Sequence, residues 1–219
     1  PGTYDGRFVA VNYVLTVYGL WYSGSLFAEH GWEPPTTWAE AMDLGAAAQD
    51  EGLYLFCWGQ EAATYYQTLA IDSAIKEAGD ELRLSLEHLE EGAWSHEALQ
   101  DVFHAMKDII DAGYFLPGGS GTQFTAAQAQ WSLEQQAILY PSGSWIENEM
   151  ADQTAEGFEM RGFPTMALSD SPALGANAIH STAGEPFIVP SDAENVAAGK
   201  ELLRTMLSRE AAEYFAREK

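Results

Sequence analysis

Two segments of the chain combine aromatic rings with short polar side chains, each where a strand is expected to pass into a helix. The first is residues 58–67 (WGQEAATYYQ) and the second is residues 142–148 (SGSWIEN). An aromatic ring offers an apolar face on which the C–H patches of a pyranose can lie, while nearby hydroxyls, amides and carboxylates can bond hydroxyl groups. This mixture predicts a pocket for a neutral polyol.

The candidate ligand contacts in these segments are aromatic side chains and the polar side chains beside them. They are Trp145, Trp58, Tyr65, Tyr66, Ser144, Glu147, Asn148 and Glu61. We expect Trp145 to stack on the ligand while helix-start amides and serine hydroxyls bond it. The alternative for each aromatic residue is a place in the core, which is the interpretation we prefer for Trp21, Trp38, Trp94 and Trp131, since they lie in periodic apolar patterns.

Motifs of several enzyme classes are absent. The sequence contains no G-x-S-x-G, no phosphate-binding glycine loop, no G-x-G-x-x-G and no H-E-x-x-H. His88, His96 and His104 are spaced by eight residues, too far apart along a helix to share a metal. A glycosidase needs two carboxyl groups about 5–10 Å apart, and Glu147 and Glu149 should point away from each other on a helix. We therefore expect no catalytic residue, no metal site and no cofactor.

The charge balance restricts the class of partner. Ten basic residues face 33 acidic ones among 219 residues, which gives a formal net charge of −23. Such a chain should repel nucleic acid, anionic membranes and acidic or phosphorylated ligands. The single cysteine, Cys57, excludes an internal disulfide and lies in an apolar run, where we expect it to be buried. No apolar run reaches the roughly 18 residues that a membrane-spanning helix needs.

Strands and helices alternate, which predicts an α/β protein with a largely parallel sheet and a ligand site beyond the strands' carboxyl ends. The expected strands are residues 8–22, 53–57, 137–140, 159–163 and 187–189. The expected helices are residues 26–30, 38–49, 62–76, 96–112, 125–133, 145–150, 191–207 and a last one capped by Ser208. Three capping boxes are predicted, at Thr37 with Glu40, Thr125 with Gln128 and Ser191 with Glu194, and Ser95 is predicted to cap the helix that follows it.

Several motifs occur in the order found in one family. They are DGRF at residues 5–8 with YGLWY at 18–22, the segment 27–40, TAAQA at 125–129 with 137–145, and residues 200–215. Together they resemble the carbohydrate ABC transporter solute-binding proteins (extracellular solute-binding protein family 1), with Arg7 and Ser23 as mild departures. Residues 64–76, supported by 119–130 and 141–150, are most similar to the actinobacterial branch that binds N-acetylglucosamine and N,N′-diacetylchitobiose.

The resemblance implies a type II periplasmic-binding-protein-like fold, in which two α/β lobes are joined by a hinge and enclose the sugar. This chain would supply mostly the second lobe plus hinge strands, and the first ~100 residues or more of such a protein would precede it. Residues 1–15 would be the end of the first lobe and the hinge, 16–180 the second lobe, and 181–219 the return crossing and helices packing at the first-lobe side. Tyr13 and His180, at the two crossings, become further candidate ligand contacts.

The implied function is the extracytoplasmic sugar-binding component of a carbohydrate ABC importer, with N-acetylglucosamine or chitobiose as the ligand. Its partners would be a neutral sugar and a membrane permease, and not nucleic acid. The whole protein would be a monomer that is secreted, periplasmic or lipid-anchored at the cell surface. The alternatives are a binding protein for another neutral oligosaccharide and a glycoside-active enzyme that uses Glu147 or Glu61.

Overall fold

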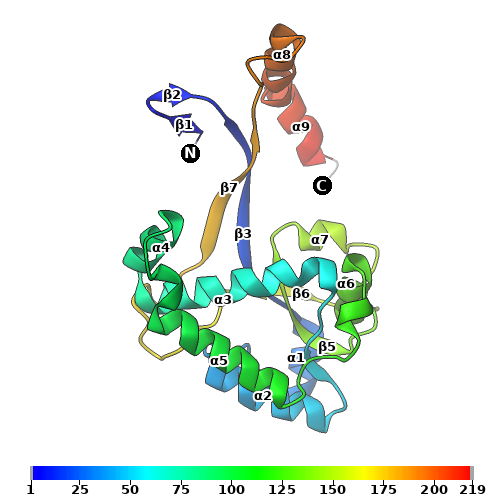
Figure 1. Cartoon of the computed structure of the whole chain (residues 1–219). Coiled ribbons are helices and arrows are strands. Elements are labelled where there is room, and N and C mark those ends of the chain that lie inside the picture. Colours follow the sequence, from blue (N-terminus) through cyan, green and yellow to red (C-terminus); the bar gives the residue numbers. More distant parts are fainter. Residues whose placement is uncertain (1, 218–219) are drawn as a thin grey trace. The chain divides into compact units, whose positions relative to one another are not determined.

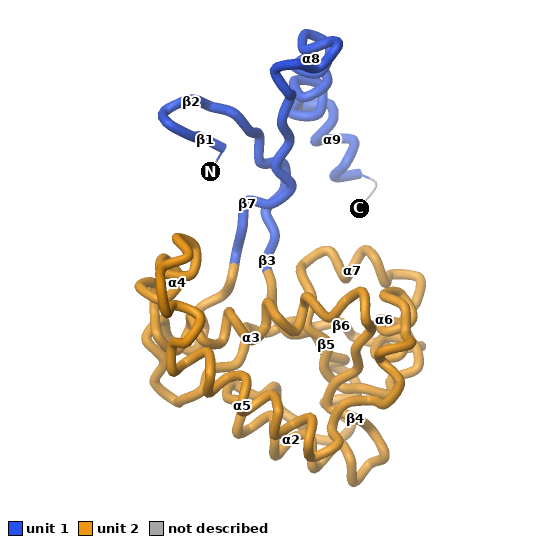
Figure 2. Tube along the Cα trace, viewed as in Figure 1, with its two compact units in different colours: residues 1–17, 181–219 blue, residues 18–180 orange. Residues whose placement is uncertain are grey.

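The computed structural model describes residues 2–217. They fall into two compact units (Figure 2): residues 18–180 form one, and residues 2–17 with 181–217 form the other. Boundaries after residues 15 and 180 were expected from the sequence. The assignment of these units to lobes and crossings of a larger protein stays a prediction.

The sheet is mostly antiparallel. Its order is β4 (Tyr54–Phe56), β5 (Ala137–Gly143), β3 (Val11–Ser23) and β6 (Met160–Phe163), and β7 (His180–Phe187) also pairs with β3. Only β4 and β5 are parallel among the pairs whose register is known, because β3 runs antiparallel to both β5 and β6. The prediction of a largely parallel sheet is therefore wrong. Alternation of strands and helices does not reveal that β3 enters the sheet between two later strands.

Helices cover this sheet in the unit of residues 18–180 (Figure 1). They are α1 (Gly24–His30), α2 (Trp38–Asp50), α3 (Ala63–Ala78), α4 (Asp80–Glu87), α5 (Glu97–Asp111), α6 (Phe124–Ser132) and α7 (Ile146–Glu149), with short 3₁₀ turns η1 (Gln60–Ala62), η2 (Ala93–Ser95) and η3 (Gly119–Gly121). Helix α5 packs against α2 and α3, while α2 contacts β4 and α3 contacts β5. This arrangement buries a large core that includes Leu20, Phe56, Leu69, Leu99 and Leu139.

The helix starts depart from the prediction in three places. The capping box of Thr37 and Glu40 is confirmed at the start of α2, and Ser208 caps α9 through the amide of Ala211. Helix α5, however, is capped by His96, whose Nδ1 accepts from the Ala98 amide at 3.2 Å, and not by Ser95. A histidine one residue later competes for the same orphan amides.

The other two predicted capping boxes are also wrong. Helix α6 begins at Phe124 without a side-chain cap, so Thr125 lies inside the helix and cannot cap it. Gln128 is buried and donates to Glu149, away from the helix start. Helix α8 (Val196–Met206) is capped by Asn195, whose Oδ1 accepts from the Ala198 amide at 2.9 Å. Asparagine is as good an N-cap as serine. Helix α8 therefore starts after Asn195 and not after Ser191.

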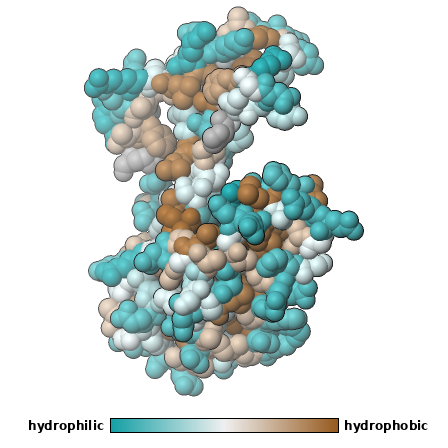
Figure 3. All heavy atoms as spheres, turned by 90° about the vertical axis from the view of Figure 1, so that its left-hand side faces the viewer, coloured by the Kyte–Doolittle hydropathy of each residue, from teal (hydrophilic) through white to brown (hydrophobic). Residues whose placement is uncertain are grey.

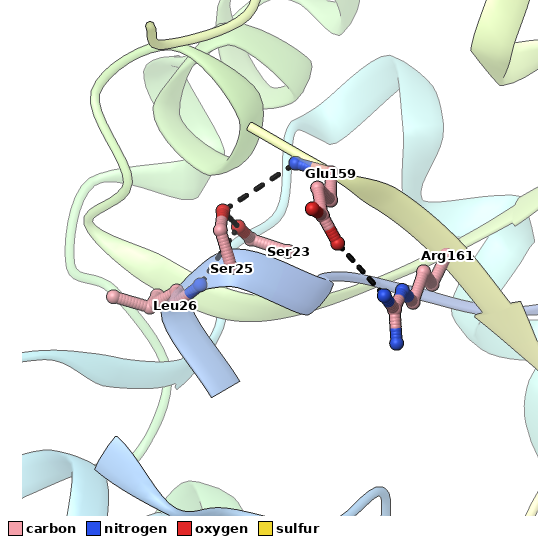
Figure 4. A network of polar contacts seen from close by, with 5 residues as sticks. All are labelled: Ser23, Ser25, Leu26, Glu159 and Arg161. Carbon is pink, nitrogen blue, oxygen red and sulfur yellow. Dashed lines mark hydrogen bonds and ion pairs between the residues drawn. The ribbon is translucent and has the colours of Figure 1, made fainter. Parts of the chain in front are cut away.

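A polar network holds the end of β3 to the start of β6 (Figure 4). The Glu159 amide donates to Ser25 Oγ at 3.4 Å. The Gly24 amide donates to the Glu159 carbonyl at 2.6 Å. Arg161 pairs with Glu159 at 2.7 Å. Its side chain lies so close to Gly24 that a Cβ at Gly24 would overlap it. Ser23 Oγ accepts from the Leu26 amide at 3.2 Å and begins α1.

Three of the four tryptophans expected in the core are buried, namely Trp21, Trp38 and Trp131. The prediction for Trp94 is wrong. Its side chain is 52% exposed, because it lies in the single turn η2 and not within a periodic helix. Cys57 is buried as expected. Its thiol donates to the Ala127 carbonyl at 3.2 Å, and burial raises the pKa of the thiol.

The second unit contains the hairpin β1 (Thr3–Tyr4) and β2 (Arg7–Phe8), the outer parts of β3 and β7, and helices α8 and α9 (Arg209–Arg217). Strand β7 ends at Phe187, earlier than the predicted strand at 187–189. The α8–α9 segment exposes Leu202, Leu207, Tyr214 and Phe215, and apolar surface is visible on this unit in Figure 3. Within residues 2–217, we find no helix with the length and apolar character required to cross a membrane.

Candidate functional site

Aromatic rings from β3, α3, α6 and the turn before α7 meet at one end of the sheet. Tyr18 of β3 contacts Trp145 edge-on, with ring centroids 5.4 Å apart and an interplanar angle of 84°. Tyr65 of α3 lies 5.9 Å from Trp145 on one side and 5.9 Å from Phe124 of α6 on the other. Trp145 and Tyr65 are both half-buried, so each ring keeps part of its surface open to a ligand.

Local backbone geometry explains the position of Trp145. Strand β5 ends at Gly143, which pairs with Tyr18 across the antiparallel ladder. The indole of Trp145 lies directly over Gly143, and a Cβ at this position would overlap three of its ring atoms. A glycine two residues before the tryptophan therefore allows the ring to fold back toward Tyr18.

A hydrogen-bonded carboxylate–imidazole pair lies beside the aromatic rings. His180 Nδ1 is 3.0 Å from Asp72 Oδ2, and the imidazole stacks on Tyr18 with centroids 4.8 Å apart and an angle of 22°. Asp72 follows Tyr65 by seven residues on α3, so the two side chains share one helix face. The hydrogen bond from Asp72 raises the pKa of His180, and partial burial opposes this.

A narrow depression opens between these groups. It is lined by Tyr18, Gly19, Tyr65, Thr68, Leu69, Asp72, Pro141, Ser142 and Thr165. Ser142 is only 2% exposed, and its Oγ has no hydrogen-bond partner among residues 2–217. The depression therefore combines apolar walls with an ionisable acceptor and a buried hydroxyl.

A second layer of polar groups supports the aromatic cluster. Gln128 is fully buried and donates through Nε2 to Glu149 Oε2 at 2.7 Å. Burial and then the charge of Glu149 raise the pKa of Tyr65. Within the described residues, the buried Tyr140 hydroxyl and Gln128 Oε1 have no hydrogen-bond partner.

The structure brings three of the predicted site residues together: Trp145, Tyr65 and His180. Ser144, next to Trp145, is exposed, as are Glu147 and Asn148 on α7 and Glu61 in η1.

The remaining predicted residues lie elsewhere. Trp58 is half-buried against the main core, and its indole covers Gly119. Tyr66 is buried, and its hydroxyl donates to the Cys57 carbonyl. Tyr13 belongs to the unit of residues 2–17 and 181–217, where it contacts Phe187 edge-on at 5.8 Å.

Tyr18, Asp72 and Phe124 belong to the site but were not singled out from the sequence. Tyr18 was interpreted as part of a long strand and of the YGLWY motif, but not as a ligand contact, although it pairs with the end of β5 in the sheet register. Asp72 carried one usable signal, which is its seven-residue spacing from Tyr65 on a helix. Phe124 precedes the start that was predicted for its helix, so it was placed in a loop.

The site's donors do not suggest a metal. No group of three or more His, Cys, Asp or Glu side chains within residues 2–217 is placed to hold a metal ion. The site instead offers ring faces, hydroxyls and one carboxylate–imidazole pair, which suits an uncharged polar ligand.

Comparison with protein families decides the broader class. Residues 1–213 match the family described as bacterial extracellular solute-binding protein. The chain belongs to this family. The resemblance seen in the sequence is thereby confirmed.

Among curated proteins, the diacetylchitobiose binding protein NgcE of Streptomyces coelicolor is 59% identical over 219 residues. The match covers 100% of this chain and 47% of NgcE, so the chain spans about half the length of this relative. The expected actinobacterial branch agrees with this similarity.

Solved structures support the fold. A chitin oligosaccharide binding protein superposes with a TM-score of 0.77 at 20% identity, over 95% of this chain and 52% of that one. The apo form of RafE from Streptococcus pneumoniae gives a TM-score of 0.71 at 16% identity, over 99% of this chain and 55% of that one. The predicted α/β fold of the type II periplasmic binding proteins is therefore confirmed.

Proposed function

We propose that this chain contributes one side of the sugar site in the binding component of a carbohydrate ABC importer, with N,N′-diacetylchitobiose or a related N-acetylglucosamine sugar as the ligand. The observation that carries the proposal is the cluster of Tyr18, Tyr65 and Trp145 beside the Asp72–His180 pair. The 59% identity to a diacetylchitobiose binding protein supports the ligand class.

The chemistry of recognition follows from the side chains. A pyranose ring would lie against the open part of the Trp145 ring, so that its C–H groups replace water on the indole face. The Asp72 carboxylate accepts hydrogen bonds, and the exposed Ser144, Asn148 and Glu147 can bond hydroxyls at the edge. A formal net charge of −23 suits a neutral ligand better than an anionic one.

The wider role is proposed from the family. Binding of the sugar would favour a closed arrangement of two lobes over an open one, and the closed form would dock on a membrane permease without breaking any bond of the sugar. We propose a monomeric protein outside the cytoplasm, lipid-anchored or free, which does not bind nucleic acid. We further propose that it is not an enzyme, since Glu149 is engaged by Gln128 and Glu147 is exposed on α7.

The test is calorimetric titration of the whole protein that contains this chain. We expect heat with N,N′-diacetylchitobiose and at least tenfold weaker binding of maltose and xylobiose. Trp145→Ala should remove most of the affinity, whereas Trp94→Ala, which truncates an exposed tryptophan outside the site, should not. Binding of maltose or xylobiose without binding of N,N′-diacetylchitobiose would overturn the proposed ligand. Release of N-acetylglucosamine from N,N′-diacetylchitobiose would overturn the proposed non-enzymatic role.

A further inference from the structure

We propose that the depression between β3, α3 and β5 is a subsite for one hydroxyl group of a neutral sugar, which donates to Asp72 and accepts from Ser142. This inference rests on the proposed function and deepens it. It concerns residues 18–180 alone, which form one compact unit.

Ser142 provides the first reason. Its side chain is almost completely removed from solvent, and its Oγ lacks a hydrogen-bond partner among the residues that the structure describes. Buried hydroxyls in folded proteins nearly always have a partner, because an unpaired one loses its bonds to water without compensation. Since Ser142 lines the depression, a group entering there supplies the missing partner.

Asp72 provides the complementary acceptor. Its side chain is 11% exposed and also lines the depression. A carboxylate offers about four lone pairs on two oxygens, and His180 engages Oδ2, so acceptor capacity remains. The imidazole is held flat against Tyr18, which keeps the carboxylate oriented.

Two basic residues lie near Asp72. His180 faces it from the start of β7, and Lys76 lies one turn further along α3. Burial lowers the pKa of Lys76 to about 8, and Asp72 opposes this change. Lys76 Nζ itself donates to the Thr165 and Ala176 carbonyls, so it does not occupy the depression.

Size and polarity select the occupant. The space inside the depression is about that of one water molecule, which suits a single hydroxyl oxygen. Asp72 would repel a carboxylate or sulfate substituent at this position, while Leu69 and Pro141 leave a charged group poorly solvated. A hydroxyl group both donates to a carboxylate and accepts from a serine, which matches the two polar groups present.

Two serines make a matched comparison. Ser132 is also fully buried, but its Oγ contacts the Gln128 and Gln153 carbonyls at 3.0 and 2.7 Å. Ser132→Ala should therefore lower the unfolding temperature and leave the sugar affinity unchanged. Ser142→Ala should do the opposite: the unfolding temperature is kept or raised, and N,N′-diacetylchitobiose binds about tenfold more weakly.

The decisive experiment titrates N,N′-diacetylchitobiose and its monodeoxyfluoro analogues into the whole protein and its Ser142→Ala variant. Fluorine cannot donate to Asp72 and is a poor acceptor for Ser142, so one analogue should bind the wild type about a hundredfold more weakly than the parent sugar. In Ser142→Ala only the contact with Asp72 remains to be lost, so this difference should shrink to about tenfold. Wild-type affinity in Ser142→Ala, or an equal loss for every analogue in both proteins, would overturn the subsite while leaving the proposed function standing. Absence of binding of the parent sugar to the wild type would overturn the proposed function, and the subsite with it.

Discussion

Gly143→Ala should weaken sugar binding through a residue that does not contact the sugar. Gly143 has no positive φ, so its backbone accepts alanine without strain. The new methyl group, however, would overlap three ring atoms of Trp145, and the indole has to move. Removing one anchoring tryptophan from an interface typically costs at least ~2 kcal/mol, which corresponds to about a 30-fold loss of affinity at 1.4 kcal/mol per factor of ten.

The same displacement should also affect stability. Trp145 would lose its ring contacts with Tyr18 and Tyr65. Aromatic pairs contribute ~0.5–1.5 kcal/mol each. Loss of both contacts should therefore lower the free energy of unfolding by about 1–3 kcal/mol. Urea unfolding of the wild type and Gly143→Ala measures this loss, and calorimetry with N,N′-diacetylchitobiose measures the affinity.

Two comparisons make the result interpretable. Gly45→Ala places a methyl group against the Tyr114 ring in the core, away from the aromatic cluster, so it should reduce stability without changing affinity. Combined with Trp145→Ala, the Gly143→Ala change should cost no further affinity, because the ring that it displaces is gone. Full wild-type affinity in Gly143→Ala, or full additivity with Trp145→Ala, would refute the reasoning.

Two further predictions concern buried and titrating groups. Tyr66→Phe should lower the free energy of unfolding by ~1–3 kcal/mol, since the Cys57 carbonyl loses its buried donor. Calorimetry should find the sugar affinity unchanged. A tenfold weaker affinity would contradict this and indicate that Tyr66 contacts the ligand. His180→Gln should reduce stability at pH 5.5 and much less at pH 8, because a raised pKa stabilises the fold below about pH 6.5 and this contribution disappears as the pH rises through the folded-state pKa. Urea unfolding at both pH values checks this, and an equal loss at both would contradict it.

Elements with strong local chemistry were predicted closely from the sequence. The Thr37–Glu40 capping box begins α2 where expected, and the β-branched and aromatic run at residues 8–22 became the long strand β3. Strand direction was not predictable in the same way, because β3 pairs with β5 and β6 across more than a hundred residues. The predicted capping box of α6 failed for a similar reason: Gln128 bonds with Glu149, a partner 21 residues away.

The candidate site shows the same division. Sequence alone determined the chemistry that is available: a load of aromatic residues beside short polar ones, a strongly acidic balance and the motifs of a solute-binding family. Only the tertiary structure decided which of two adjacent tyrosines joins the aromatic cluster with Trp145. Successive residues on a helix point about 100° apart, so the packing of α3 against β5 and α5 turns Tyr66 into the core and Tyr65 toward Trp145. The same packing places Asp72 beside His180, which stacks on Tyr18. These three residues are too far apart in the sequence for a local pattern to reveal that they meet.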